Sequence, residues 1–231
     1  MMRSTFRLTL LFSLLTALSP FTIMAADAIE EIVVKASYRE TTLENNDGSL
    51  MILSEEQLKA EPMKHLEQLS FLVPNLNFAL SDGRPRYFQI RGIGEQSGYE
   101  GTPNSSVGLM IDDIDFSGQG GISSSFDMEQ IEVHRGPQGS RMGANALAGM
   151  IYMRSKQPTD VFEGLSELSL GSDGVRSVGV AFGGPLQDNP AIKYRVSIRN
   201  DESDGFRKNS YLNRDDTTGK DELTVRLKLN H

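Results

Sequence analysis

A run of short, glycine-spaced segments between Phe88 and Pro158 constrains the fold of this chain more than any other feature. Twelve of its 22 glycines lie between Gly92 and Gly149. Glycine at this density permits tight turns and close approach of backbones, and it disfavours long regular elements. The sequence therefore predicts a compact α+β module with one small mixed sheet, built from strands near 86–91, 107–112, 129–134 and 149–155 and a short helical turn over 140–146.

Two short helices are predicted just before this run, at 54–60 and 62–72. Ser54 is placed as an N-cap for the first helix, and Gln57 can complete a capping box. Pro62 suits the first position of the second helix. Apolar residues follow at near-helical spacing until Pro74 ends the pattern, and we expect them to face the core: Met63, Leu66, Leu69 and Val73.

The pattern changes beyond Pro158 to long amphipathic strands. Apolar and polar residues alternate over 192–199 and 223–230, and less regularly over 161–170 and 178–183. Alternation with a period of two predicts strands that have one apolar face. Short turns and one longer polar segment between such strands are typical of outer-membrane barrels. A soluble antiparallel sandwich has the same alternation, so the strands alone leave both architectures open.

The first 26 residues have the pattern of a secretory signal peptide. Arg3 and Arg7 precede an apolar stretch, Leu8 to Leu18, and small residues close the segment. A buried N-terminal helix is the alternative. The stretch is too short for a transmembrane helix, which needs roughly 20 apolar residues, and no other stretch is longer. Any integral-membrane interpretation therefore depends on β-strands.

Residues 27–48 are predicted to be a flexible tether that carries one β-prone patch, Ile29 to Ala36. Its β-branched centre is flanked by charges, so it can pair as a strand but has too little apolar surface to fold alone. An ordinary first strand of the following module is the alternative.

Composition and motif spacing exclude several classes of function. The formal net charge of −8 argues against nucleic-acid binding, and the absence of cysteine excludes disulfides, thiolate metal sites and a cysteine nucleophile. An EF-hand-like spacing from Asp113 ends at Ser124, which cannot supply the bidentate carboxylate. The three histidines form no metal-spaced pair, and no nucleophile has a paired base. We therefore predict no catalytic residue, metal or cofactor, and no enzyme.

The order and spacing of the segments in the glycine-rich run resemble the plug domain of the TonB-dependent outer-membrane receptors. These segments are Phe88 to Gly94, Val107 to Asp115, Gln130 to Gly139, Gly143 to Gly149 and Met150 to Pro158. The chain departs from the family pattern at Asp112-Asp113, where the family usually has Asp-Gly, and at Arg141-Met142-Gly143, where Leu-Tyr-Gly is common.

The resemblance implies four parts: a signal peptide (1–26), a TonB box and flexible tether (27–48), a plug (49–158) and the first strands of a transmembrane β-barrel (159–231). The family's barrel has 22 strands, of which about four are expected here, so we expect a fragment or a truncated product. The TonB box would add a strand to the periplasmic domain of TonB, which is energised from the inner membrane. Its residues are Ile29, Glu30, Glu31, Ile32, Val33, Val34, Lys35 and Ala36.

Arg91 and Arg135 fall on the two plug arginines of the family, which meet glutamates on the inner barrel wall. The resemblance therefore assigns them as plug–barrel contacts. A buried guanidinium needs such partners, because an unpaired buried charge is costly. A solvated charge at the end of a strand is the alternative for each.

The function implied by the resemblance is energised uptake through the outer membrane, with the barrel facing lipid and the plug and TonB box facing the periplasm. The expected substrate is a large scarce nutrient, foremost a ferric siderophore-type chelate. Arg84, Arg86 and Tyr99, in loops expected at the plug apex, are candidate contacts for an anionic or aromatic ligand. The competing hypothesis is a soluble periplasmic binding or interaction module without transport activity.

Overall fold

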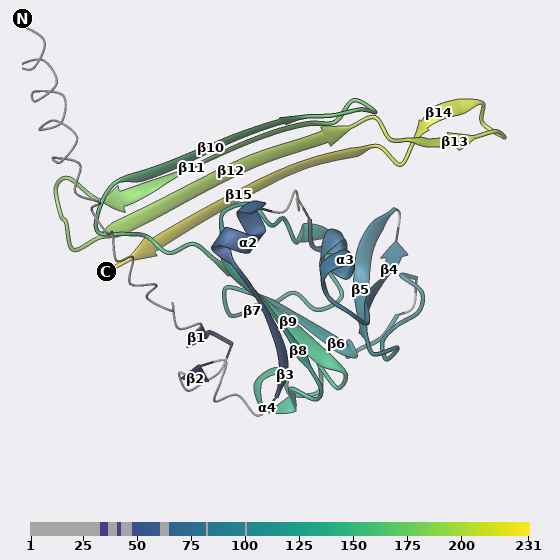
Figure 1. Cartoon of the computed structure of the whole chain (residues 1–231), viewed down its shortest axis with the longest axis horizontal. Coiled ribbons are helices and arrows are strands. Elements are labelled where there is room, and N and C mark those ends of the chain that lie inside the picture. Colours follow the sequence, from purple (N-terminus) through teal and green to yellow (C-terminus); the bar gives the residue numbers. More distant parts are fainter. Residues whose placement is uncertain (1–32, 37–40, 43–47, 61–64, 82, 100) are drawn as a thin grey trace, which may run out of the picture. The chain divides into compact units, whose positions relative to one another are not determined.

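The computed structural model describes residues 33–36, 41–42, 48–60, 65–81, 83–99 and 101–231. The predicted signal peptide, residues 29–32 of the TonB box and the expected start of the second helix at Pro62 lie outside the described residues. Two sheets dominate the described part, one of five strands and one of four (Figure 1).

The five-stranded sheet is mixed, as the glycine-rich run predicts. Its strand order is β3-β8-β9-β6-β7, in which β6 and β9 are parallel and all other neighbours are antiparallel. The strands are β3 (Ser49–Ser54), β8 (Met128–Arg135), β9 (Gly149–Ser155), β6 (Val107–Ile111) and β7 (Ile114–Asp115). The short edge strands β3 and β7 were not predicted.

The strand expected near 86–91 exists as β5 (Arg84–Ile90), but it does not join this sheet. It pairs instead with β4 (Leu76–Ser81) in a separate antiparallel hairpin. Arg91 and Gly92 both have positive φ, at 54° and 77°, and they turn the chain away where the ladder ends. The prediction of a single sheet is therefore wrong in this detail, because the turn at the end of β5 separates it from β6.

The helices are short, and side chains cap the first two helical segments. Helix α2 (Glu55–Ala60) begins after the predicted capping box, in which the Ser54 amide donates to Gln57 Oε1 at 3.1 Å. The second helical segment consists of a 3-10 turn η2 (Leu66–Gln68) followed by α3 (Leu69–Leu72). A second capping box at His65 and Gln68, which was not predicted, begins it. Two further helical turns are η3 (Gly120–Ile122) and α4 (Gly139–Met142).

One face of the five-stranded sheet packs against these helices and forms the main core. Leu66, Leu69 and Val73 are at most 1% exposed and contact Ile131 of β8 and Ile151 of β9 in one apolar cluster. The expectation that this apolar face lies in the core is confirmed for Leu66, Leu69 and Val73, while Met63 lies outside the described residues. Residues 49–155 are called the first module below.

The four-stranded sheet is antiparallel throughout, with the order β10-β11-β12-β15. Its strands are β10 (Glu163–Leu170), β11 (Arg176–Pro185), β12 (Lys193–Ser203) and β15 (Lys220–Asn230). These match the four predicted amphipathic strands. Between β12 and β15 the long polar segment forms a small hairpin of β13 (Arg207–Asn209) and β14 (Arg214–Thr217).

The two faces of this sheet have opposite polarity and opposite burial. Its polar face is buried, with Arg195, Arg199 and Ser197 at most 4% exposed. Its apolar face is open, with Leu223 and Leu229 at 66% and 68% exposed. A soluble sandwich buries the apolar face of each sheet, so the observed arrangement is the reverse of the sandwich alternative.

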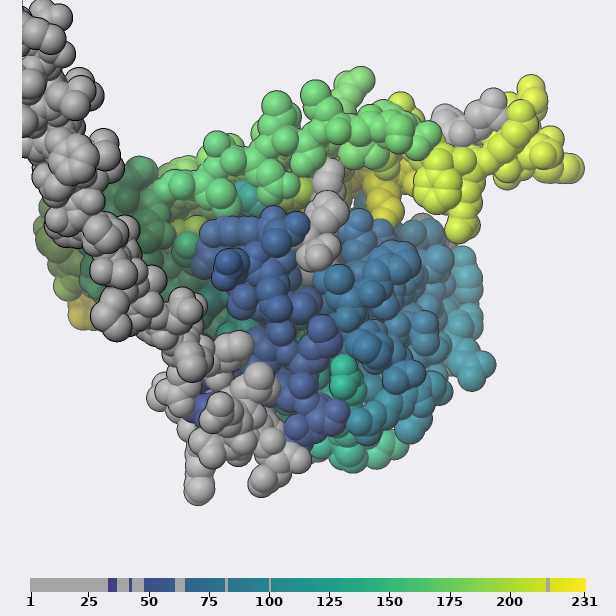
Figure 2. Space-filling view, viewed as in Figure 1, coloured from purple at the N-terminus to yellow at the C-terminus, as the bar shows by residue number. Residues whose placement is uncertain are grey.

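The hairpin between β12 and β15 exposes large apolar side chains. Phe206, Tyr211 and Leu212 are all more than half exposed. In Figure 2 the yellow side chains around this hairpin stand clear of their neighbours. Among the described residues, no helix is both long and apolar enough to cross a membrane.

Candidate functional site

The polar face of the four-stranded sheet carries a row of cations that contact the first module. Arg195 and Arg199 lie on β12, and Arg226 and Lys228 lie on the neighbouring β15. Because alternate residues of a strand share a face, all four point to the same side. The first module meets them with carboxylates and backbone carbonyls.

The deepest of these contacts joins Arg195 to Asp127. The guanidinium donates from Nε and Nη2 to the two carboxylate oxygens, at 2.8 and 2.5 Å. The two side chains are 4% and 3% exposed. Two charged side chains that are buried this deeply must pair closely. Removing either one would leave the other charge buried and unpaired, which would strongly destabilise the fold.

Phe126, the residue before Asp127, contacts three residues of the four-stranded sheet: Arg199, Arg226 and Gly179. The Arg199 guanidinium carbon lies 5.2 Å from the centre of the Phe126 ring. Arg226 donates to the carbonyls of Phe126 and Ser124, at 2.6 and 2.7 Å. The ring occupies the space left by Gly179 of β11, where a Cβ would lie 2.7 Å from the ring. Residues 124–127 are therefore the main anchor between the two parts.

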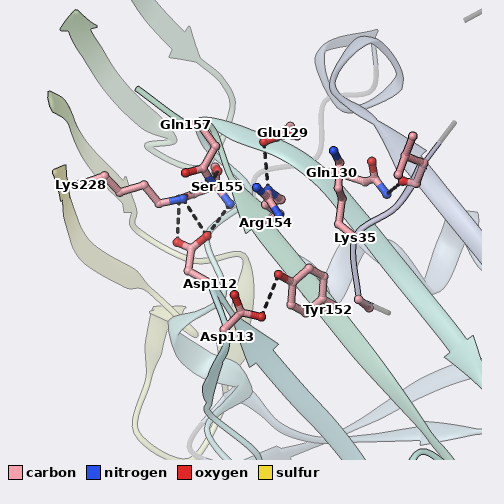
Figure 3. Close-up of polar contacts among 12 residues, drawn as sticks. Lys35, Asp112, Asp113, Glu129, Gln130, Tyr152, Arg154, Ser155, Gln157 and Lys228 are labelled. Atoms are coloured by element: carbon pink, nitrogen blue, oxygen red, sulfur yellow. Dashed lines mark hydrogen bonds and ion pairs between the residues drawn. The ribbon is translucent and has the colours of Figure 1, made fainter. Parts of the chain in front are cut away.

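Asp112 forms a second anchor, in the turn between β6 and β7 (Figure 3). Its carboxylate accepts hydrogen bonds from Lys228 Nζ at 2.8 Å and from the amide and hydroxyl of Ser155 at 2.9 and 2.6 Å. Burial opposes ionisation of this carboxyl, but the hydrogen bonds from Lys228 and Ser155 outweigh it, so the pKa of Asp112 lies below its ordinary value.

The next residue, Asp113, organises the other side of the same turn. It accepts hydrogen bonds from the Tyr152 hydroxyl at 3.1 Å and from Arg141. Burial and the nearby carboxylate of Asp113 together raise the pKa of Tyr152 to about 12. Asp112 and Asp113 both have positive φ, at 48° and 68°, so the turn keeps the geometry that a family Asp-Gly pair would take.

The described part of the predicted TonB box, Val33–Ala36, lies against β8 of the first module. Val33–Val34 forms β1, which pairs with β2 (Thr41–Thr42). Val34 and Ala36 are 1% and 3% exposed. Polar side chains of the module hold the backbone of this segment: Gln130, Glu132 and Arg141.

The predicted ligand contacts differ in their availability, and Arg84 and Arg86 lie on β5 rather than in a loop as expected, because the strand begins at Arg84. Arg84 donates to the Glu222 carboxylate at 2.9 Å and to the Asp221 carbonyl at 3.0 Å, so it is bound to β15. Arg86 donates to the Gly98 carbonyl at 2.7 Å. Tyr99, in the adjoining loop, is 73% exposed.

The two predicted plug–barrel arginines are placed differently from each other. Arg91 is exposed at the end of β5. Arg135, at the end of β8, lies 3.4 Å from Ser49 Oγ and 3.8 Å from the sulfur of Met51, and its Nε is buried without a partner among the described residues. No described contact joins either arginine to the four-stranded sheet. Their predicted pairing with barrel glutamates therefore stays a prediction.

Sequence reasoning missed the contacts that do join the two parts. It expected cations on the module and carboxylates on the strands. The Arg84–Glu222 pair has this polarity, whereas the Arg195–Asp127 and Lys228–Asp112 pairs have the opposite one. The available signal was the recurrence of arginine and lysine at alternate positions of the predicted strands. The roles of Gln130 and Glu132 had no sequence signal, because their partner is a distant stretch of backbone.

A cavity of about 300 Å³ lies between η2 and the ends of β11, β12 and β15. Its lining combines carboxylates such as Glu67 and Glu222 with Lys220 and the apolar side chains of Val175 and Phe206. In the part of the chain that the structure describes, no three His, Cys, Asp or Glu side chains are grouped so that they could hold a metal ion.

The family model of the TonB-dependent receptor plug domain matches residues 42–150. The chain carries a TonB-dependent receptor plug domain. This match confirms the family recognised from the glycine-spaced segments. It covers β3, β6, β7 and β8, the helices and the anchor at 124–127, and it ends at the start of β9. The first module is called the plug from here on.

Relatives and solved structures extend the similarity beyond the plug. The chain is 27% identical over 195 residues to the ferric enterobactin receptor PirA of Pseudomonas aeruginosa, covering 76% of this chain and 26% of the relative. It is 27% identical over 192 residues to the pesticin receptor of Yersinia pestis, covering 81% and 28%. The crystal structure of the ferric yersiniabactin uptake receptor FyuA from Yersinia pestis superposes with a TM-score of 0.70 at 25% identity, covering 80% and 29%.

These alignments extend beyond the plug, because each of them covers more residues than the plug contains. The α+β plug followed by antiparallel strands of a receptor barrel is therefore confirmed as the fold class. The chain spans about a quarter of the length of the curated relatives it matches.

Proposed function

We propose that this chain is the N-terminal part of a TonB-dependent outer-membrane receptor that takes up a large scarce nutrient, foremost a ferric siderophore-type chelate. The proposal rests on the two faces of the four-stranded sheet. The cations of this sheet face the plug, and its leucines and valines face outward. A strand wall with an apolar exterior and a polar interior suits a barrel in lipid. A soluble periplasmic module would have to leave that face in water, and no observation favours it.

The relatives support the class of substrate. Two that are named by their ligand, the enterobactin and yersiniabactin receptors, take ferric chelates. The chain is also 29% identical over 111 residues to the vitamin B12 transporter BtuB of Vibrio vulnificus. Ferric chelate uptake is the nearer inference, because the alignments with iron receptors continue through the strands.

We further propose that ligand contacts the plug near Tyr99 and Arg86. Tyr99 offers an exposed aromatic ring, while Arg84 is engaged by Glu222 and serves better as a contact between plug and strands. Arg91 and Arg135 would pair with glutamates on further strands of the barrel wall. Tyr99→Ala should weaken binding of a ferric chelate by the complete receptor, and Tyr211→Ala, on the β13–β14 hairpin, is the matched aromatic control.

The TonB box proposal is tested on a peptide spanning Asp27 to Tyr38 and the periplasmic domain of TonB. Strand addition relies on main-chain hydrogen bonds, so Val33→Pro, which removes an amide donor, should abolish the chemical-shift changes that the unchanged peptide causes in TonB. Tyr38→Pro, outside the box, should leave them intact. If the unchanged peptide causes no shifts while a box peptide from a characterised receptor does, the assignment of the TonB box is wrong.

A further inference from the structure

Side chains of the plug hold the backbone of Val33–Ala36, in which Val33 and Val34 pair with β2 but Lys35 and Ala36 belong to no strand. Gln130 Nε2 donates to the Val33 carbonyl at 3.1 Å. The amide of Lys35 donates to Glu132 Oε1 at 2.5 Å, and the amide of Ala36 donates to the two oxygens of Glu132 at 3.1 and 3.2 Å. Figure 3 shows Gln130 beside this segment. Arg141 donates to the Ala36 carbonyl from the other side.

This arrangement cannot coexist with an extended strand at the same residues. In a β-strand the amides of successive residues point to opposite edges, so one partner strand pairs with every second residue. Here the successive amides of Lys35 and Ala36 converge on one carboxylate, and the chain bends at both residues. A partner strand and Glu132 therefore compete for the same amides.

Displacing Glu132 from these two amides costs free energy, which a partner strand would have to supply. Its side chain is completely buried, and its other partners are Gln130 Nε2 and His134 Nε2, both at 2.8 Å. Removing the two backbone donors would leave a buried carboxylate with only part of its hydrogen bonding. Ala36 would also leave the small apolar cluster formed with Met110 and Tyr152.

We propose that Glu132 is an internal latch for the TonB box. Its carboxylate takes the place of a pairing strand at Lys35 and Ala36, so TonB binds only the fraction of molecules in which the latch is open. The proposal rests on the TonB-binding function above. Apparent affinity for a partner falls with the populated fraction of the competent state, so opening the latch should strengthen binding.

The test uses the full chain in detergent micelles and the periplasmic domain of TonB. Glu132→Gln keeps the shape of the side chain but removes its charge, and it should tighten TonB binding by roughly tenfold. Glu129→Gln is the matched control, since Glu129 lies on the same strand but bonds Arg154. Circular dichroism of both variants checks that the plug is folded.

A spin label at Lys35→Cys gives an independent measurement without TonB. The label should be immobile in the unchanged chain and in Glu129→Gln, and mobile in Glu132→Gln. If Glu132→Gln does not fold, Arg141→Met removes the donor to Ala36 and should mobilise the label as well. Asp113→Asn changes the carboxylate that accepts from Arg141 and Tyr152 but keeps the Arg141 donor to Ala36, so it should not mobilise the label.

The outcomes separate the latch from the function. Equal label mobility in Glu132→Gln and Glu129→Gln, or in Arg141→Met and Asp113→Asn, overturns the latch. Mobilisation of the label without any TonB binding by any variant supports the latch and contradicts the proposed function. If the label becomes mobile but TonB does not bind more tightly, Glu132 and TonB do not compete for the segment, because its release would then not improve TonB binding.

Discussion

At the scale of single residues, the plug places Asp112 and Asp113 in a turn that suits glycine better. A positive φ is uncommon outside glycine, although aspartate is among the residues that tolerate it. Here each side chain has a specific task, since Asp112 bonds Lys228 and Ser155 while Asp113 bonds Arg141 and Tyr152. Contacts outside the turn thus maintain a conformation that the local sequence disfavours.

Asp112 should make the attachment of the strands sensitive to acid. Because its pKa in the folded chain lies below the ordinary value of 3.8, its contribution is complete above pH 3.8 and is lost as pH falls through the folded pKa. Asp112→Asn should lower the free energy of unfolding at pH 7 by about 1–2 kcal/mol, and the difference from the unchanged chain should shrink in strong acid. Urea unfolding at several pH values measures this.

The control is Asp188→Asn, an exposed carboxylate in the turn between β11 and β12. A loss at pH 7 that is the same for Asp188→Asn and Asp112→Asn would contradict the role of Asp112. Sequence analysis could place the turn from the family pattern, but not its partner, because Lys228 lies 116 residues away.

At the scale of elements, the alternation of apolar and polar residues predicted the strands. It did not predict which face of the sheet is buried. Period-2 alternation describes a barrel wall and a soluble sandwich equally well. The burial of Arg195 and Arg199 against Phe126 and Asp127 decides between them. That information belongs to the tertiary contact, so no property of the strands by themselves could have supplied it. The capping box at Ser54, by contrast, is local and was predicted correctly.

Gly179 of β11 should tolerate no side chain, because the Phe126 ring fills the space where one would lie. Gly179→Val places methyl groups where the Phe126 ring lies, and overpacking of this kind costs about 1–3 kcal/mol. Gly164→Val on β10 is the control, because a Cβ there meets nothing closer than 3.9 Å. Unfolding in detergent, followed by circular dichroism, should show a lower midpoint for Gly179→Val alone. Equal midpoints for the two variants would mean that Phe126 does not depend on this space.

At the scale of the whole molecule, the plug and the four strands differ in what holds them. The plug has a continuous apolar core, while the strands are attached to it through ion pairs and hydrogen bonds and leave their apolar face open. The plug could be predicted as a unit because its signatures are local in sequence. The attachment could not, since it joins residues 68 to 153 positions apart.

Limited trypsin digestion should reveal this difference. In detergent, the first cuts should fall before Gly48 and in the exposed β13–β14 hairpin, at Arg207, Lys208 or Arg214. Longer digestion should remove residues after Ser155 and leave a core of plug size. Without detergent the open apolar face should cause aggregation. Protection through Leu229 in detergent-free buffer would instead show that the strands belong to a soluble domain.

The anchor at residues 124–127 also has a consequence for how the strands find their alignment. A slip of β12 by one residue would turn Arg195 and Arg199 outward and bring Val196 and Ile198 against the carboxylate of Asp127. A misaligned β12 would thus place an arginine on the apolar face of the sheet and leave the buried Asp127 carboxylate without a cation. A folded plug therefore acts as a template that rejects wrong alignments from the inside, before lipid has any part in selecting them.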